Sequence, residues 1–108
     1  MDVREDQNCK VHLAGGSVYQ GGIKGSAYHG RGKIIRSNGD YFEGTFVDGK
    51  KTGRGVLKSG DALYEGNFEN DMKHGSGKIT YENEENEVFE GTFFEDQKHG
   101  KGTLQGKT

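Results

Sequence analysis

Hydrophobic residues recur along the chain in one short pattern, aromatic-x-Gly-x-apolar. The pattern occurs four times, as YQGGI from Tyr19, FEGTF from Phe42, YEGNF from Tyr64 and FEGTF from Phe89. Alternation of apolar and polar positions is the periodicity of a β-strand with one buried face. A helix is disfavoured, because each interior glycine costs up to about 1 kcal/mol relative to alanine. Each copy therefore predicts a strand.

A second strand is predicted after each copy, where a Gly-x-Gly motif precedes an aliphatic residue by two positions. The motifs with their aliphatic residues are Gly30/Gly32 with Ile34, Gly53/Gly55 with Leu57, Gly75/Gly77 with Ile79, and Gly100/Gly102 with Leu104. The dipeptides between the two strands are Gly25-Ser26, Asp48-Gly49, Asn70-Asp71 and Glu95-Asp96. Asp-Gly favours a type I′ turn and Gly-Ser a type II′ turn, so each copy predicts a β-hairpin. A further turn at Ser59-Gly60 continues the meander.

The four hairpins are tandem repeats of about 23 residues. The predicted units are a flexible segment 1–8, a half repeat 9–18, and repeats 19–41, 42–63, 64–88 and 89–108. One such repeat buries too little apolar surface to fold alone, so neighbours must stack. We therefore predict an all-β fold, a single-layer twisted antiparallel β-meander of about nine strands. The chain stops at Thr108 before a fifth aromatic strand, which suggests a fragment or a last strand that is exposed or paired with a partner.

Folding the second repeat about Asp48-Gly49 predicts its register. Phe42 then lies opposite Gly55, Gly44 opposite Gly53, and Glu43 opposite Arg54. An aromatic ring laid over a cross-strand glycine shields the backbone from water, so we interpret the glycines as space for the rings. The glycines assigned this structural role are Gly21, Gly30, Gly32, Gly44, Gly53, Gly55, Gly66, Gly75, Gly77, Gly91, Gly100 and Gly102.

These motifs resemble the MORN repeat (membrane occupation and recognition nexus), and YEGNFENDMKHGSGKITY is similar to a consensus copy. The resemblance covers Tyr19 to Leu104 and implies a hairpin-repeat fold. It also implies cytoskeletal, ciliary or membrane association, and binding to acidic phospholipids has been proposed for such repeats. The copies depart from the pattern in places: the first has Gln20, Gly22, Ile23 and Tyr28, the second has Thr52, and the third has a long connection, YENEENEV, expected to disturb the register.

Composition narrows the function classes. The chain has one cysteine, Cys9, which excludes an internal disulfide framework and a cysteine-based zinc site. A formal charge of −2 gives no general attraction to nucleic acid, and no signal peptide or membrane span is visible, so a cytoplasmic location is expected. On one face, basic residues alternate with Gln20, Glu43, Glu65 and Glu90, which predicts a ladder of cross-strand ion pairs. The basic residues are Arg31, Lys33, Arg54, Lys78 and Lys101.

Candidate catalytic and metal-binding residues all belong to repeat columns. His29, His74 and His99 occupy one column, and equivalent strands lie roughly 9–10 Å apart, so no metal site is predicted. GTLQGKT lacks the spacing of a phosphate-binding loop, and no catalytic triad stands out. We expect a protein without enzymatic activity or cofactor.

The aromatic face is the strongest candidate for a partner surface, because a one-layer sheet is not expected to hide all of its rings. The candidate residues are Tyr19, Phe42, Phe46, Tyr64, Phe68, Phe89 and Phe93, together with Lys51, Lys73 and Lys98. Each lysine is predicted to lie opposite the second apolar residue of its copy and to cover the rings with its stem. The predicted function is a protein-interaction scaffold with an aromatic-lined groove for a peptide or helix. The alternatives are a peripheral membrane adaptor for acidic phospholipids or phosphoinositides and a targeting module of a larger enzyme. Self-association through the end strands or the aromatic face is a further expectation.

Overall fold

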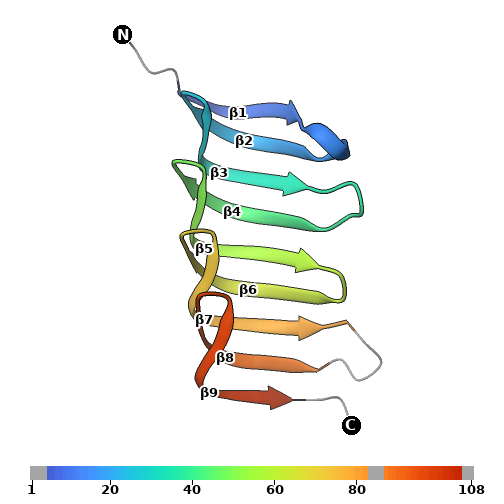
Figure 1. Cartoon of the computed structure of the whole chain (residues 1–108), viewed down its shortest axis with the longest axis vertical. Coiled ribbons are helices and arrows are strands. Elements are labelled where there is room, and N and C mark those ends of the chain that lie inside the picture. Colours follow the sequence, from blue (N-terminus) through green and yellow to red (C-terminus); the bar gives the residue numbers. More distant parts are fainter. Residues whose placement is uncertain (1–4, 83–86, 106–108) are drawn as a thin grey trace.

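The computed structural model describes residues 5–82 and 87–105, with side chains at 8–82 and 87–97. The described strands form one antiparallel sheet whose order follows the chain, as shown in Figure 1. The strands are β1 (Glu5–His12), β2 (Val18–Lys24), β3 (Ala27–Ile35), β4 (Tyr41–Val47), β5 (Lys50–Ser59), β6 (Ala62–Glu69), β7 (Met72–Tyr81), β8 (Val88–Phe94) and β9 (Gln97–Gln105). A short 3-10 turn, η1 (Ala14–Gly16), joins β1 to β2. The predicted all-β meander is confirmed.

The four predicted dipeptides form the hairpin turns. Asp48 and Gly49 have φ angles of 49° and 83°, and Asn70-Asp71 and Glu95-Asp96 also have positive φ at both residues. Two positive φ angles define the type I′ geometry, which fits the twist of the flanking strands. The turn predicted at Ser59-Gly60 lies one residue later, at Gly60 and Asp61, because Ser59 pairs with Ala62.

The predicted hairpin register is wrong, because the second strand of every hairpin carries a two-residue bulge. In the second repeat Gly44 pairs with Gly55, while Thr45 pairs with Thr52, so Gly53 and Arg54 have no counterpart in β4. Phe42 consequently lies opposite Leu57 instead of Gly55, and Glu43 lies opposite Val56. The same two-residue insertion occurs in β3, β7 and β9.

The two glycines of each Gly-x-Gly motif have different structural causes. The first has a positive φ, 83° at Gly30, 67° at Gly53 and 79° at Gly75. A Cβ at Gly30 or Gly53 would meet no atom within 4 Å, so the conformation alone favours glycine there. The second glycine belongs to a continuous row of paired glycines across seven strands: Gly21, Gly32, Gly44, Gly55, Gly66, Gly77 and Gly91.

Six of the paired glycines lie under aromatic rings: Gly21, Gly32, Gly44, Gly55, Gly66 and Gly77. A Cβ at Gly55 would lie 2.7 Å from Cε1 of Phe42, and a Cβ at Gly44 would lie 2.7 Å from Cζ of the same ring. Tyr19 covers Gly32 and Tyr64 covers Gly77 in the same way. The rings therefore cover glycines diagonally across the strands, so space for a ring explains these six glycines and does not explain Gly30 or Gly53.

The bulges bend the sheet along a line that crosses all four hairpins. Figure 1 shows the hairpin tips turned away from the direction of the main strands. A bulge bends its strand and increases the local twist, and the positive φ of Gly30, Gly53 and Gly75 marks the bend on successive second strands. The bent sheet has a corner, and the aromatic core lies inside this corner.

Hydrogen bonds link each hairpin tip to the tip before it. The backbone N–H of Asp71 donates to the carbonyl of Lys51 (3.2 Å), and the Asp71 carboxylate accepts from the N–H of Lys51 (2.8 Å). Asp96 and Lys73 repeat this arrangement one hairpin later, at 3.0 and 2.8 Å. The N–H of Gly49 donates to the carbonyl of Tyr28 (2.9 Å), but glycine has no carboxylate to accept a second hydrogen bond. The tips thus stack on one another as a second row of contacts.

Two further expectations are corrected. The segment predicted to be flexible, 1–8, is strand from Glu5 onward, because β1 pairs along β2 as far as Lys24; residues 1–4 lie outside the described residues. The long connection after β7 does not disturb the register, since β7 and β8 pair without irregularity from Gly75–Phe93 to Thr80–Val88. The N–H of Tyr81 donates to the carbonyl of Glu87 and closes that connection at 2.7 Å.

Candidate functional site

The seven rings predicted as a partner surface form one continuous zigzag. Six edge-to-face contacts connect them, with centroid distances of 5.0–5.8 Å and interplanar angles of 79–87°. The order is Tyr19, Phe46, Phe42, Phe68, Tyr64, Phe93 and Phe89. Edge-to-face pairs are favourable beyond their area burial, by about 0.5–1.5 kcal/mol each. The zigzag gives the repeats their shared core.

The rings are not exposed to a partner. Six of them are only 0–4 % exposed, and Phe89 is half-buried. The expectation that a one-layer sheet leaves its aromatic face open is wrong, because the bend at the bulges encloses the rings in the corner of the sheet. A partner that approaches this face therefore meets the residues beside and above the rings.

Two of the three candidate lysines cover the rings. The ammonium of Lys51 lies 5.3 Å from the centroid of Phe42, and that of Lys73 lies 5.6 Å from the centroid of Tyr64. Each lysine pairs with the second aromatic residue of its repeat, as predicted, and Lys98 pairs likewise with Phe93. The side chain of Lys98 lies outside the described part of the chain.

Tyr28 has the corresponding role in the first repeat, where the other copies have lysine. Its ring stacks on Tyr19 with a centroid distance of 3.8 Å and an interplanar angle of 11°. It also contacts Phe46 edge-to-face at 5.5 Å. The departure of the first copy from the repeat pattern is therefore an aromatic cover for the first ring of the zigzag.

Both tyrosines of the zigzag have hydroxyl groups that reach the backbone. Tyr19 donates to the carbonyl of Gly22 at 2.6 Å, and Tyr64 donates to the carbonyl of Asn67 at 2.7 Å. Burial raises the pKa of Tyr64 to about 12, and burial together with the nearby Tyr28 and Cys9 raises the pKa of Tyr19. Phe42 occupies the same column without a hydroxyl, so these bonds stabilise individual repeats and are no requirement of the fold.

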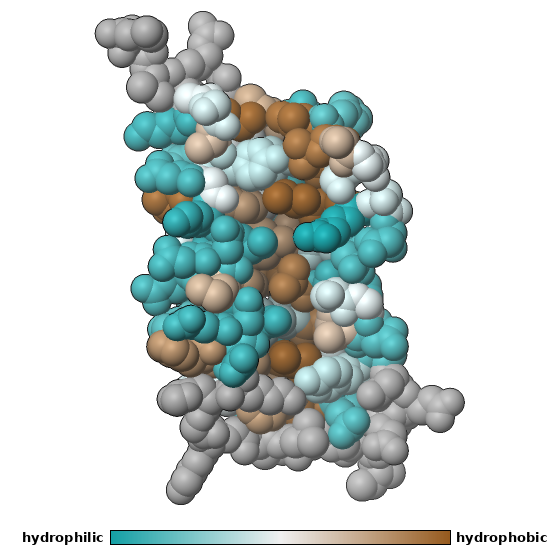
Figure 2. Space-filling view, in the orientation of Figure 1, coloured by the Kyte–Doolittle hydropathy of each residue, from teal (hydrophilic) through white to brown (hydrophobic). Residues whose placement is uncertain are grey.

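A lengthwise apolar groove remains accessible on the same face. One row of cross-strand pairs alternates aromatic and aliphatic residues, and its aliphatic members with described side chains are Val11, Ile34, Leu57 and Ile79. Ile34 and Leu57 are half-buried and packed against the rings, whereas Ile79 is only 8 % exposed and belongs to the core. Figure 2 shows an apolar band that runs along the molecule between hydrophilic borders. The aliphatic column is recognisable in the sequence, but its pattern alone does not indicate a partner-binding role.

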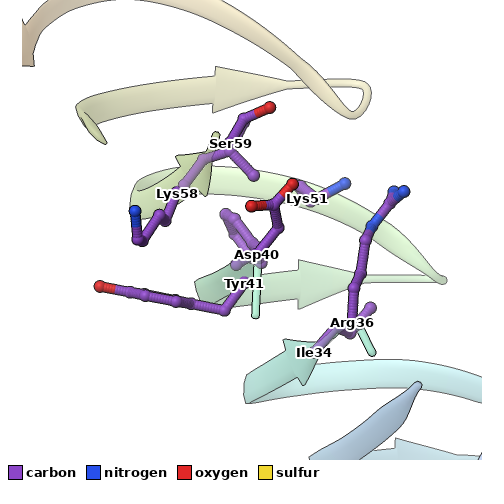
Figure 3. A pocket seen from close by; sticks show the side chains of 9 residues that line it. Ile34, Arg36, Asp40, Tyr41, Lys51, Lys58 and Ser59 are labelled. Atoms are coloured by element: carbon purple, nitrogen blue, oxygen red, sulfur yellow. The ribbon is translucent and has the colours of Figure 1, made fainter. Parts of the chain in front are cut away.

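A hollow of about 230 Å³ opens in this groove around the second repeat (Figure 3). Its lining residues are Ile34, Arg36, Asp40, Tyr41, Phe42, Lys51, Leu57, Lys58 and Ser59. Asp40 is already engaged: its carboxylate accepts from the N–H of Gly60 (3.0 Å) and from the amide of Asn38 (3.2 Å). The hollow combines an aliphatic floor with cationic side chains.

The opposite face carries the charged residues, but it is not a ladder of close ion pairs. Lys33 lies opposite Glu43, and Lys78 lies opposite both Glu65 and Glu90. Among the described side chains, none of these pairs approaches within 4.0 Å. The three described ion pairs are Lys51–Asp71, Lys58–Glu82 and His74–Glu69. Because the turn after β5 lies one residue later than predicted, Arg54 pairs with Asn67 and not with Glu65.

The histidine column has local structural contacts. The Nδ1 atom of His29 accepts from the N–H of Asp48 at 3.5 Å. His74 lies 3.2 Å from the carboxylate of Glu69, and its ring lies 5.3 Å from that of Phe94. The side chain of His99 lies outside the described residues. Among the residues that the structure describes, no group of three or more His, Cys, Asp or Glu side chains gathers as a metal site would require.

Comparison with known families agrees with this geometry. A family model for the MORN repeat matches residues 19–41, 42–61, 64–84 and 89–108, and the four matches begin at the four aromatic residues that start the hairpins. Such repeats are generally modules for protein or membrane interaction, are typically not enzymes, and suggest membrane or cytoskeleton association. No helix in the described ranges has the length and apolar character needed to cross a membrane. The chain belongs to the MORN-repeat family.

Proposed function

We propose that the protein is a binding scaffold that holds an apolar segment of a partner protein in the groove beside the aromatic zigzag. The observation that supports this is the apolar band between hydrophilic borders, which follows the long axis of the molecule in Figure 2. The rings stabilise the floor of the groove from below. Ile34 and Leu57, both half-buried, offer the apolar surface that a partner would cover.

The regular spacing of the groove residues suits an elongated ligand. Ile34, Leu57 and Ile79 are each two strands apart, and each lies beside a ring of the zigzag. Strands are separated by roughly 4.8 Å, so these residues recur about every 10 Å along the groove. A small molecule would use one such position, whereas a peptide or helix would use several and add their contributions.

A pair of neighbouring residues tests the proposal. Leu57 faces the groove, and Val56 next to it faces the opposite side of the sheet, where it lies between Glu43 and Glu65. Both are half-buried. Leu57→Glu and Val56→Glu thus introduce the same charge at adjacent positions on opposite faces.

The assay is binding of peptides selected on the wild-type protein from a displayed random library. We expect Leu57→Glu to weaken binding at least about tenfold, which corresponds to 1.4 kcal/mol, and Val56→Glu to leave it unchanged. Circular dichroism checks that both variants stay folded. Equal losses in the two variants would contradict the proposal. Binding to vesicles that contain a phosphoinositide, with no peptide selected, would favour the membrane-adaptor alternative instead.

A further inference from the structure

The groove has cationic groups that a seated partner would have to compensate. Lys51 has a side chain that is 24 % exposed, and its only described ion pair is the 4.0 Å contact with Asp71. The guanidinium of Arg36, in the same hollow, has no hydrogen bond or ion pair among the described side chains. In Figure 3 both side chains extend toward the same side of the hollow, whereas Tyr41 and Lys58 extend the other way.

The carboxylate in the hollow does not balance these cations. Asp40 accepts hydrogen bonds from Gly60 and Asn38, and Lys58 is held by the carbonyl of Gly60 (2.9 Å) and by Glu82 (4.0 Å). Covering the hollow with an apolar partner alone would remove water from the exposed Arg36 guanidinium and from Lys51, whose described carboxylate partner, Asp71, is 4.0 Å away. Uncompensated burial of charge is costly, so the hollow favours a partner that brings a carboxylate.

A further cation, Lys73, occurs one repeat along the groove. Lys73 covers Tyr64 as Lys51 covers Phe42. The two lysines lie on β5 and β7, which are separated by one intervening strand, so their backbones are about 10 Å apart. The aliphatic residues of the groove, Leu57 and Ile79, are on the same two strands and have the same separation.

This spacing matches an α-helix that lies along the groove. Two turns of helix contain about seven residues and advance roughly 10.5 Å, so positions seven apart return to the same side of the helix. In an extended strand, roughly 10 Å corresponds to three residues, and side chains three apart point to opposite faces. Of these two conformations, the helix is the one that presents both an apolar residue and a carboxylate to each repeat.

From the proposed function and these contacts, we infer that the groove binds an amphipathic helix with acidic residues seven positions apart beside its apolar stripe. The carboxylates pair with Lys51, together with Arg36, and with Lys73 in the next repeat. The apolar stripe covers Ile34 and Leu57 and continues past Ile79, which is itself only 8 % exposed. A helix of about 20 residues is about 30 Å long and would cross roughly six strands.

A selection from displayed helices of about 20 residues, randomised along one face, tests this inference. We expect enriched helices to carry Leu or Ile with Asp or Glu at seven-residue spacing. Fluorescence anisotropy should show at least about tenfold weaker binding to Lys51→Glu/Lys73→Glu than to wild type. The same protein variant should bind better to helices in which lysine replaces the selected acidic residues.

Lys51→Met/Lys73→Met is the matched control, because methionine keeps an apolar stem over each ring while removing the charge. It should stay folded and lose most of the preference for acidic helices. Enriched helices without the acidic spacing, or affinity that does not respond to either lysine variant, would overturn the inference. If helices without the acidic spacing still bind more weakly to Leu57→Glu than to wild type, the proposed groove function stands. If no peptide of any kind is selected, that function fails as well.

Discussion

Replacing Gly53 and Gly55 one at a time separates the two structural causes within a single Gly-x-Gly motif. Gly53 has φ of 67° and open space around a Cβ, whereas a Cβ at Gly55 would lie 2.7 and 3.0 Å from two atoms of Phe42 and 3.3 Å from the carbonyl of Glu43. Gly53→Ala should cost about 1–2 kcal/mol through left-handed backbone strain. Gly55→Ala should cost about 1–3 kcal/mol through overpacking, because Phe42 is held by Phe46 and Phe68.

Asparagine distinguishes the two causes better than alanine does. Asparagine adopts positive φ readily, so Gly53→Asn should be less destabilising than Gly53→Ala. At Gly55 the larger side chain meets the Phe42 ring, so Gly55→Asn should be more destabilising than Gly55→Ala. The free energy of unfolding is measured by urea denaturation followed by circular dichroism, since the chain has no tryptophan.

A double-mutant cycle with Phe42→Leu completes the test. The smaller side chain should reduce the cost of Gly55→Ala and leave the cost of Gly53→Ala unchanged. If alanine and asparagine rank in the same order at both positions, or if Phe42→Leu couples equally to both glycines, the two glycines do not have separate structural causes.

Three further perturbations follow from the contacts. Asp71→Ala should lower the free energy of unfolding by about 1–3 kcal/mol, since it removes the acceptor for the N–H of Lys51 and places alanine at a φ of 70°. Asp71→Asn should cost less than half as much in the same denaturation assay. Because the pKa of Tyr64 is raised from 10.0 to about 12 in the fold, its contribution to stability is fully present below pH 10 and is lost as the pH rises toward 12. The free energy of unfolding of Tyr64→Phe should therefore decrease less over that range. Equal pH profiles of the variant and the wild type would contradict this expectation. Phe46→Ala should destabilise the whole array by about 3–5 kcal/mol, because it interrupts the zigzag between Tyr19 and Phe42, and a loss below about 1 kcal/mol in thermal or urea unfolding would contradict the core assignment.

Local turn chemistry made the hairpins predictable. Asp48-Gly49 and Gly25-Ser26 are strong turn signals, and the repeat extended the assignment to Asn70-Asp71 and Glu95-Asp96, which are weaker signals alone. The structure confirms all four positions. The pairing of each lysine with the second aromatic residue of its repeat could also be predicted from its distance to the turn, since no bulge lies between Lys51 and Asp48-Gly49.

The register and the burial of the rings were not predictable from the same pattern. The two glycines of Gly53-x-Gly55 look alike in sequence, and nothing there shows that Gly53 has a positive φ within a bulge. A sheet without the bulges has no corner and leaves the rings open to a partner, which is what the sequence pattern predicts. The candidate surface consequently moves from the rings to Ile34, Leu57 and the lysines above them, and this change depends on three-dimensional curvature that periodicity does not encode.

The groove is tested most directly by an NMR titration of the isotope-labelled protein with a peptide selected on it. Binding in the groove predicts that amide shift changes centre on Ile34, Leu57 and Ile79, and that they extend to Lys51 and Lys73. Changes centred instead on Ile35, Val56 and Glu65, which lie on the opposite face, would contradict binding in the groove.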